Sequence, residues 1–509
     1  MRLTDLTGAL RVQRLLGTAD KDVKALKYRS DKCEAGDAFF ALRGRDADGH
    51  DFIADAAARG AQVIFVEDAA ACASDIKNNP DLTIVEVPDT RQALALTAAA
   101  FYRYPARELL TVGITGTKGK TTTAFLLQAI FEAAGMQTGI IGTVHCGYEE
   151  HYHAAANTTP ESCELQRMLR EMADGGCKAV VMEVSSQGLK FSRAAGIPFD
   201  YALFTNLSPD HIGIGEHRDF AEYTYWKSRL FSQCETAVLH DGDSAWVSMA
   251  AHSSAKKKIF FGITGSAHSN DTADSGAAGE SISAADTVHA CEVRLFSAGG
   301  RLGSAFRLQD GADFVIGLPG MHNVENALGA IAVARDLGIA DDVIRQALRT
   351  VFVPGRTETV DIGPDRIALV DYAHNGVALQ HLLETLRTYE PRRLLLVFGC
   401  GGERAPKRRI EMGRVAAQMA DLCIVTSDNP RREDPLGIIG DITAAMDAAG
   451  GGSYQVIADR REAIRTAVQM TGPGDMLVIA GKGHETDQII GTEVRHFDDR
   501  EELRKGRRL

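Results

Sequence analysis

Short runs of apolar residues alternate with amphipathic stretches along most of the chain, as strands alternate with helices in α/β proteins. Continuous apolar runs predict strands that are buried on both faces, as in parallel sheets. The clearest runs lie at residues 109–112, 178–184, 201–206, 367–370, 394–398, 422–426 and 476–480. Because helix-like stretches separate these runs, the pattern predicts an α/β protein with two doubly wound parallel sheets.

Breaks in this pattern divide the chain into three blocks. Tyr104-Pro105 ends an Ala-rich helical stretch directly before the first strong apolar run, since the residue before proline disfavours helix. A long helical run at about 322–350 leads to Val353-Pro354-Gly355. We therefore predict a smaller N-terminal α/β domain, a central mononucleotide-binding domain and a C-terminal Rossmann-like domain, at residues 1–107, 108–352 and 353–509.

Composition narrows the class of protein. The net charge of −12 argues against binding to nucleic acid or to anionic membranes. The nine cysteines include no CxxC pair, which indicates neither a zinc site nor a disulfide framework. Met1 to Leu16 has no apolar core long enough for a signal peptide, and no run approaches the length of a membrane span, so we expect a cytoplasmic protein. We also expect a monomer. Residues 264–290 are rich in Ser, Ala, Gly and Asp, which predicts a mobile loop or an irregular insertion.

A Gly-rich turn between a predicted strand and a predicted helix gives the strongest chemical signal, Gly113-Ile114-Thr115-Gly116-Thr117-Lys118-Gly119-Lys120-Thr121-Thr122. Glycines let the backbone wrap closely around phosphate, and N–H groups at a helix N-terminus face the anion. Lys120 can reach the β- and γ-phosphates, and the Thr121 hydroxyl can ligate Mg²⁺. Five residues, rather than the usual four, separate Gly113 from Gly119. The strand–turn–helix context still favours an ATP or GTP site over a surface turn with chance lysines.

Polar residues follow several of the predicted strands, at the sheet edge where ligands gather in α/β proteins. In the central block, Glu183 ends one strand and could complete a Mg²⁺ shell with Thr121, although a solvated strand-end glutamate is the alternative. His211 follows the next strand. In the last block, four polar clusters follow successive strands, at 371–375, 399–404, 426–431 and 480–485. Each cluster is a weak signal by itself, but four on one sheet predict a concave polar site.

Together these segments resemble the Mur ligase family, which forms peptide bonds with ATP and includes folylpolyglutamate synthases. The resemblance extends from about Tyr28 to Glu501 and rests on residues 116–122, 157–160, 182–186, 205–211, 322–326, 354–356 and 371–374. Asp428-Asn429-Pro430-Arg431 and Gly481-Lys482-Gly483-His484-Glu485 are similar to the members that extend UDP-N-acetylmuramoyl-L-alanyl-D-glutamate. Arg29-Ser30-Asp31 is similar to the family's uridine-binding domain.

The resemblance implies an ADP-forming ligase of peptidoglycan precursor synthesis, on which cell wall biogenesis, cell shape and cell division depend. Its substrates would be ATP, the UDP-muramoyl dipeptide and a diamino acid, and an acyl phosphate would be the intermediate. The Asp-Asn-Pro-Arg form resembles enzymes that add meso-diaminopimelate. Residues 211–217 resemble some lysine-adding enzymes, so L-lysine is the alternative. Another Mur-type or folylpolyglutamate-type ligase, or a nucleotide-dependent switch or binding protein, would leave the N-terminal or acceptor motifs unexplained.

The resemblance also implies roles for individual residues. The catalytic residues would be Lys120, Glu183, His211 and Lys227. ATP would bind to Gly116, Thr117, Lys118, Gly119, Lys120, Thr121, Thr122, His322, Asn323, Arg356 and Asp371. The UDP-muramoyl substrate would bind to Ser30, Asn157, Thr158, Thr159, Ser185 and Arg193. The amino acid would bind to Arg409, Asp428, Asn429, Arg431, Gly481 and Glu485.

The resemblance places Mg²⁺ at two positions. Thr121 and Glu183 would hold one ion. Glu183, His211 and Lys227 would hold a second. A protonated lysine cannot ligate a cation, and the family carries this lysine as a carbamate, so Lys227 is expected to be N6-carboxylysine.

Overall fold

The computed structural model describes residues 1–44, 47–70, 79, 81–153, 157–213, 215–264, 286–298 and 300–507. Most of the segment predicted as a loop or insertion, at 264–290, therefore lies outside the described residues. The chain forms two compact units. The first comprises Met1–His289 and Leu328–Ala340, and the second comprises Ala290–Ala327 and Asp341–Leu509.

The N-terminal part of the first unit is a five-stranded sheet in the order β1-β5-β4-β3-β2. Its strands are β1 (Arg14–Leu16), β2 (Leu26–Lys27), β3 (Ala38–Phe40), β4 (Val63–Val66) and β5 (Thr83–Glu86). Neighbours pair in parallel except for β1, which is antiparallel to β5. Phe40 and Phe65 pack on one face and Phe39 and Ile64 on the other, because successive side chains of a strand point to opposite faces. The helices of this part are α1 (Leu3–Thr7), α2 (Ile53–Ala58) and α4 (Thr90–Phe101).

The central sheet of the first unit has the strand order β13-β12-β11-β6-β10-β7-β8-β9. Its strands are β6 (Leu110–Thr115), β7 (Thr138–Ile141), β8 (Cys146–Tyr148), β9 (His151–His153), β10 (Ala179–Glu183), β11 (Phe199–Phe204), β12 (Cys234–His240) and β13 (Lys257–Ile263). Its helices are α5 (Lys120–Ala133), α6 (Ser162–Asp174), α7 (Ser186–Lys190), α8 (Phe220–Ser228) and α9 (Trp246–Ala251). The strands from β13 to β7 pair in parallel, so the residues that follow β6, β10 and β11 meet at one edge.

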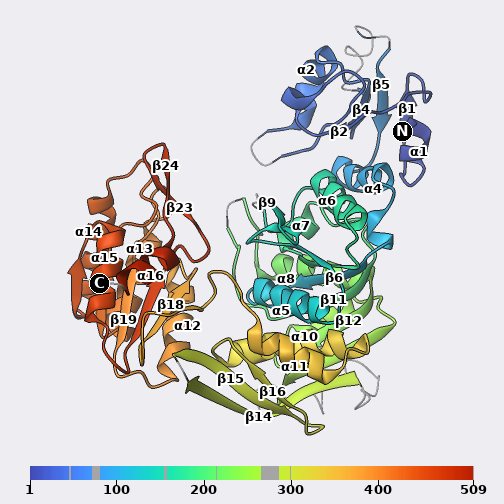
Figure 1. Ribbon diagram of the computed structural model, residues 1–509. Coiled ribbons are helices and arrows are strands. Elements are labelled where there is room, and N and C mark those ends of the chain that lie inside the picture. The colour runs from blue at the N-terminus through green and yellow to red at the C-terminus, as the bar shows by residue number, and fades with distance from the viewer. Residues whose placement is uncertain are drawn as a thin grey trace. The chain divides into compact units, whose positions relative to one another are not determined.

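The main sheet of the second unit has the order β17-β18-β22-β19-β20-β21, and all its pairs are parallel except β17 with β18. Its strands are β17 (Glu358–Val360), β18 (Ile367–Asp371), β19 (Leu394–Phe398), β20 (Leu422–Val425), β21 (Tyr454–Val456) and β22 (Met476–Ala480). Its helices are α12 (Gly376–Arg387), α13 (Lys407–Met419), α14 (Pro435–Ala448), α15 (Arg460–Met470) and α16 (Asp499–Gly506). Leu396 packs with α12, α13 and α14 on one face, and Val397 packs with α15 and α16 on the other. Figure 1 shows this α/β sandwich in orange and red.

Two antiparallel elements accompany these sheets. The strands β14 (Thr287–Ala298), β15 (Arg301–Leu308) and β16 (Asp313–Ile316) pair in sequence, β14 with β15 and β15 with β16. The strands β23 (Asp487–Ile490) and β24 (Glu493–His496) form a hairpin, labelled in Figure 1. The helices between β16 and β17 are α10 (Met321–Asp336) and α11 (Asp341–Thr350).

The predicted fold class is confirmed, because parallel-dominated sheets with covering helices form in all three regions. The helical run predicted at about 322–350 consists of two helices, α10 and α11. Gly338 lies between them with φ +76°, a left-handed conformation that ends a helix. Among the described helices, none is long and apolar enough to cross a membrane.

A core substitution on β19 should destabilise the second unit. Leu396 is fully buried, so Leu396→Ala should lower the free energy of unfolding by about 2–5 kcal/mol, through lost burial and a cavity. Val456 on the edge strand β21 is exposed, and Val456→Ala should change that free energy by less than about 0.5 kcal/mol. Urea unfolding followed by circular dichroism measures both, and equal effects would contradict the assignment of Leu396 to the core.

Candidate active site

The Gly-rich loop connects the end of β6 to the first turn of α5. Gly116 and Gly119 have φ values of +148° and +85°, in the left-handed region that favours glycine. A Cβ atom on Gly116 would lie 1.9 Å from the Thr205 hydroxyl, which excludes larger residues. The Lys118 N–H donates to the Asn206 side chain at 2.9 Å and so fixes the loop to the strand-end next to it. This loop therefore has the backbone that a phosphate at a helix N-terminus requires.

Two lysines point at one backbone carbonyl of this loop. The Lys120 ammonium donates to the carbonyl oxygens of Gly116 at 2.8 Å and Thr117 at 3.1 Å. The Lys227 side chain, from α8, donates to the same Gly116 oxygen at 2.7 Å. Burial, and then the charge of Lys120, lower the pKa of Lys227 well below its ordinary value, while Asp210 acts in the opposite direction. The surroundings of Lys227 therefore stabilise its neutral amine relative to its ammonium form.

Tyr223 contacts both Lys227 and the loop. Its hydroxyl is 3.1 Å from the Thr117 hydroxyl, and its ring centroid is 4.6 Å from the Lys227 nitrogen. The ring of His211 lies 6.3 Å from that of Tyr223. The His211 side chain is 54% exposed, and its Nδ1 lies 3.1 Å from a Glu216 carboxylate oxygen. Neither Tyr223 nor Glu216 was predicted as a site residue, because aromatic and acidic residues near a loop carry no distinctive spacing.

Glu183 and Thr121 form the second feature of this edge. Glu183 ends β10 and is buried, and each of its carboxylate oxygens lies 3.0 Å from the Thr121 hydroxyl. Thr143, which the sequence did not single out, donates its N–H at 2.9 Å and its hydroxyl at 3.2 Å to the same carboxylate. A carboxylate beside a hydroxyl is the hard-oxygen set that Mg²⁺ prefers, so this pair fits one magnesium ion.

The residues predicted for the second metal site, Glu183, His211 and Lys227, are not joined by direct contacts in the same way in the described part of the chain. Within the described residues, no hydrogen bond or ion pair joins Glu183 to His211 or Lys227, and no three His, Cys, Asp or Glu side chains are grouped for a metal. His211 is instead paired with Glu216. The second metal site, which also requires a carbamate on Lys227, stays a prediction.

The predicted UDP-muramoyl residues on the central sheet cluster around Glu183. The Thr158 hydroxyl lies 3.0 Å from that of Thr143. The Thr159 hydroxyl donates to the Glu183 carbonyl at 3.0 Å and accepts from the Ser185 N–H at 3.0 Å. Thr159 therefore contacts the Glu183 backbone, and Thr158 is linked to the Glu183 carboxylate through Thr143.

Arg193 joins the same group through Thr159. Its guanidinium donates to the Thr159 carbonyl at 3.1 Å and pairs with Glu161 at 2.6 Å. Arg91, which was not predicted, lies 3.7 Å from the same Glu161 carboxylate and 4.6 Å from the centre of the Phe191 ring. This part of the first unit thus has two arginines around one glutamate.

Ser30 and Asn157 are the two residues predicted for the UDP-muramoyl substrate that lie outside this hydrogen-bonded group. Ser30 begins a short 3₁₀ helix, Ser30–Lys32, and is half-buried, whereas Asn157 is exposed. The Tyr28 hydroxyl donates to Glu164 of α6 at 3.0 Å, which connects the segment before Ser30 to the central part of the same unit.

Four predicted ATP-binding residues belong to the second unit. Asp371 ends β18 and accepts the N–H groups of Thr357 at 2.7 Å and Ala373 at 2.8 Å. Burial raises the pKa of Asp371, while Arg356 and these two amides act in the opposite direction. The Arg356 guanidinium lies 5.1 Å from the centre of the Tyr372 ring.

The other two residues of this group are on α10. His322 is exposed, whereas Asn323 is buried. The Asn323 amide donates to the Pro319 carbonyl at 2.7 Å and accepts from Asn326 at 3.2 Å, so it holds the start of the helix.

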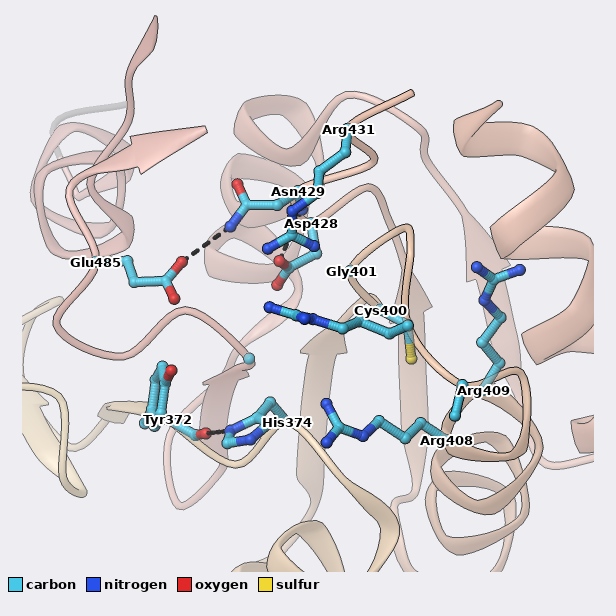
Figure 2. A pocket seen from close by; sticks show the side chains of 13 residues that line it. Tyr372, His374, Cys400, Gly401, Arg408, Arg409, Asp428, Asn429, Arg431 and Glu485 are labelled. Carbon is cyan, nitrogen blue, oxygen red and sulfur yellow. Dashed lines mark hydrogen bonds between the residues drawn. The ribbon is translucent and has the colours of Figure 1, made fainter. Parts of the chain in front are cut away.

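A cavity of about 110 Å³ opens where β18, β19, β20 and β22 end, as the four predicted polar clusters require (Figure 2). Its lining residues are Tyr372, His374, Cys400, Gly401, Arg404, Ala405, Arg408, Arg409, Asp428, Asn429, Arg431, Gly481 and Glu485. All six residues predicted for the amino-acid substrate are among them.

The acidic side of the cavity is tightly hydrogen-bonded. The Asn429 amide donates to Glu485 at 2.9 Å. Lys482 is buried beneath them and donates to both side chains at 3.3 Å and to the Asp487 carbonyl. A Cβ atom on Gly481 would lie 2.6 Å from the Asp428 carboxylate, so glycine is needed to leave that carboxylate its space. Lys482 belongs to the Gly481–Glu485 motif, but its place in the sequence alone predicted no role for it.

Arg431 and Arg409 differ in whether their guanidinium groups form ion pairs with other described residues. Arg431 has φ +53° and donates to the Gly402 carbonyl at 2.6 Å, and among the described residues it has no ion-pair partner. Arg409 instead pairs with Glu433 at 2.6 Å and Asp441 at 2.9 Å. In Figure 2, Arg409 lies apart from the group around Asp428.

Arg408, one residue earlier, extends toward His374 in Figure 2. It lines the cavity and, like Arg404, forms no ion pair among the described side chains. Arg408 is therefore better placed than the predicted residue Arg409 to add positive charge to the cavity.

A phosphate-binding loop and a cavity lined by charged side chains are the two sites that an ATP-dependent ligase requires. Comparison with known proteins identifies the family. Three Mur ligase models match in order along the chain: the Mur ligase family catalytic domain at residues 22–102, the middle domain at 114–334 and the glutamate ligase domain at 355–483. The chain is 40% identical over 492 residues to UDP-N-acetylmuramoyl-L-alanyl-D-glutamate--2,6-diaminopimelate ligase of Geobacillus kaustophilus, covering 94% of each chain. The chain belongs to the Mur ligase family.

Further comparisons agree. The enzyme of the same name from Clostridium perfringens is 36% identical over 506 residues, with 98% of each chain covered. A solved structure of a UDP-N-acetylmuramoyl-L-alanyl-D-glutamate--2,6-diaminopimelate ligase is 27% identical, with a TM-score of 0.69, and covers 100% of this chain and 99% of its own. Folylpolyglutamate synthase of Mycobacterium tuberculosis, 19% identical, has a TM-score of 0.57 and covers 77% of this chain, which shows a shared fold alone.

Proposed function

We propose that the chain adds meso-diaminopimelate to UDP-N-acetylmuramoyl-L-alanyl-D-glutamate at the expense of ATP. The cavity of the second unit carries this proposal, because it presents carboxylates and an unpaired arginine to one small ligand. Asp428 and Glu485 suit the ammonium group of an amino acid, and Arg431 suits a carboxylate. Relatives named for this reaction, matched over nearly the full chain, support the same substrates.

The proposed reaction has three steps. The γ-phosphoryl group of ATP is transferred to the γ-carboxylate of D-glutamate, which gives an acyl phosphate and ADP. The neutral amine of the diamino acid then attacks the acyl carbon, a C–N bond forms, and the nitrogen loses one proton to solvent. The tetrahedral intermediate loses phosphate as the C–O bond breaks, and the amide remains. Lys120 stabilises the negative charge on the transferred phosphoryl group. Because ATP and the UDP-linked dipeptide are substrates, we expect the reaction in the cytoplasm.

We assign magnesium to Thr121 and Glu183, where a bound ion would neutralise phosphate charge. The Lys227 amine would add to CO₂, with formation of an N–C bond and release of one proton. The resulting carbamate, with Glu183 and His211, would form the second metal set. The burial of Lys227, which lowers its pKa, supports this modification, because only the neutral amine adds to CO₂.

We place the domain boundaries at 1–107, 108–352 and 353–509. The three matched family ranges, 22–102, 114–334 and 355–483, fall within them and support this division. We assign binding of the UDP-muramoyl substrate to the first two domains, and binding of the acceptor amino acid to the third.

An assay of phosphate release tests the proposed function. The enzyme is supplied with ATP, Mg²⁺ and UDP-N-acetylmuramoyl-L-alanyl-D-glutamate, with meso-diaminopimelate or L-lysine offered in parallel. We expect phosphate release that depends on the dipeptide and on meso-diaminopimelate. Equal or greater turnover with L-lysine would overturn the acceptor assignment, and release that needs neither substrate would overturn the ligase assignment.

Arg431 should set the preference for meso-diaminopimelate, which differs from lysine by a carboxylate on its far carbon. A charge-assisted hydrogen bond contributes about 1.5–3 kcal/mol, so Arg431→Ala should raise the KM for meso-diaminopimelate about ten- to a hundredfold. The preference of the enzyme for meso-diaminopimelate over L-lysine should fall by a similar factor. Arg432→Ala is the matched control, since its exposed neighbouring side chain lies outside the cavity lining. An unchanged ratio of the two substrates in Arg431→Ala would contradict the role.

A further inference from the structure

A buried arginine lies directly behind the acceptor cavity. Arg460, the first residue of α15, is 1% exposed and donates to both carboxylate oxygens of Asp499, at 2.8 Å and 2.7 Å. The nitrogen Nη2 also donates to the Ala480 carbonyl at 3.1 Å, at the end of β22. Arg460 is thus held by α16 and by the strand that precedes the Gly481–Glu485 loop.

The remaining nitrogen of this guanidinium lies near Asp428, a residue of the cavity lining. Nη1 of Arg460 is buried, forms no hydrogen bond within the described part of the chain, and lies 4.0 Å from Oδ2 of Asp428. The other Asp428 oxygen accepts the N–H of Asn429 at 2.7 Å. Asp428 is therefore the group toward which the unused donor of Arg460 points.

The ionised carboxylate of Asp428 needs a nearby cation to offset the effect of burial. Its side chain lines the cavity but is largely buried, and burial raises its pKa, while Arg460 and then Lys482 act in the opposite direction. The other titratable or charged groups around it are Glu485, Asp499, Tyr372, His374, Cys400, Arg404, Arg408 and Arg431. Of the cations, only Arg460 is within ion-pair distance of Asp428 in the described structure.

We propose that Arg460 is a positioning residue, which keeps Asp428 an ionised carboxylate that is directed into the cavity for the ammonium group of the incoming amino acid. Arg460 does not itself line the cavity, so it acts through Asp428. The inference rests on the proposed function, because it assumes that the cavity takes a diamino acid. Asp499 completes the arrangement by holding two of the three guanidinium nitrogens, which leaves Nη1 for Asp428.

A purely structural role is the competing explanation. Arg460 and Asp499 join α15 to α16, and loss of a buried pair alone would destabilise the fold. Such a loss would lower stability and activity at every pH. A role through Asp428 predicts a pH-dependent effect, because a buried carboxyl without its cation has a raised pKa and becomes neutral as the pH falls.

The test compares Arg460→Gln with wild type through the KM for meso-diaminopimelate between pH 6.5 and 9, with ATP and the dipeptide saturating. Without the Arg460 cation, the Asp428 carboxyl is protonated more as the pH falls, so the ratio of variant to wild-type KM should be about ten at pH 7 and should approach one at pH 9. The ratio cancels the titration of the diamino acid itself. Arg460→Lys, which keeps the charge, should move the ratio back toward one at pH 7.

Arg461→Gln is the matched control, since Arg461 is next on α15 with a side chain 47% exposed, and its ratio should stay near one. Asp428→Asn provides a second check: adding Arg460→Gln to it should produce no further pH-dependent change. A KM ratio for Arg460→Gln that is constant with pH would overturn the inference while leaving the proposed function intact.

Two further outcomes are also decisive. If wild type shows no turnover with meso-diaminopimelate, the proposed function fails and this inference fails with it. If neither Arg460 variant folds, the dependence of the wild-type 1/KM for meso-diaminopimelate on pH decides. A fall in 1/KM as the pH drops toward 6.5, which Asp428→Asn abolishes, would show that Arg460 does not keep Asp428 ionised. No such fall would support the proposal.

Discussion

Replacing Lys120 by alanine is expected to lower kcat by about a thousandfold. Lys120 lies at the N-terminus of α5, with its ammonium on the Gly116 and Thr117 carbonyls of the phosphate loop. Phosphoryl transfer depends almost entirely on positioning and on electrostatic stabilisation of the transferred group. Loss of a single well-placed donor costs about 10²–10³ in rate, and a full positive charge close to the phosphates should be at the upper end.

Single-turnover measurement of acyl phosphate and ADP formation, with saturating ATP and dipeptide, isolates this step from amine attack. Lys256→Ala is the control, because Lys256 is an exposed lysine of the same unit that pairs with Glu235. Its kcat should match that of wild type. A Lys120→Ala enzyme with a raised KM for ATP but nearly normal kcat would show that Lys120 binds ATP and transition state equally, which contradicts the proposed role.

Much of the fold, and the grouping of polar residues around the cavity of the second unit, could be predicted from the sequence, for reasons specific to parallel sheets. Strands buried on both faces have to be apolar throughout, so runs such as Leu394–Phe398 stand out without an alignment. Parallel strands also end at one edge, which made it possible to place Asp428 and Glu485 in one cavity although 57 positions separate them in the chain.

Side-chain directions could not be predicted in the same way. Arg408 and Arg409 are adjacent on α13, so they differ by about 100° around the helix, and only the partners Glu433 and Asp441 show which one turns away from the cavity. Arg460 was missed for a related reason, because an arginine at the start of a helix carries no signal of burial. Its contact with Asp499 requires the packing of α15 on α16.

Replacing Lys227 by alanine should also nearly abolish turnover, with a loss of at least about a thousandfold if the carbamate holds a catalytic metal. Lys227 is fully buried against Tyr223 and the Gly116 carbonyl, with the positive charge of Lys120 close by. A second buried ammonium would be repelled there, whereas a carbamate would be attracted to Lys120 and could ligate a cation. The chemistry of this site therefore favours the modified residue.

Two measurements separate the carbamate from a lysine that only supports the loop. In wild type, ¹³C-labelled CO₂ should give a carbamate signal by NMR that is absent from Lys227→Ala. A small carboxylic acid such as formate or acetate should restore part of the activity of Lys227→Ala by replacing the lost anion, whereas it should leave Lys120→Ala inactive, since that variant lacks a cation. Near-normal turnover of Lys227→Ala, or a wild-type enzyme without the carbamate signal, would remove Lys227 from the metal site. The roles of Thr121 and Glu183 would be unaffected, because their contact at 3.0 Å does not involve Lys227.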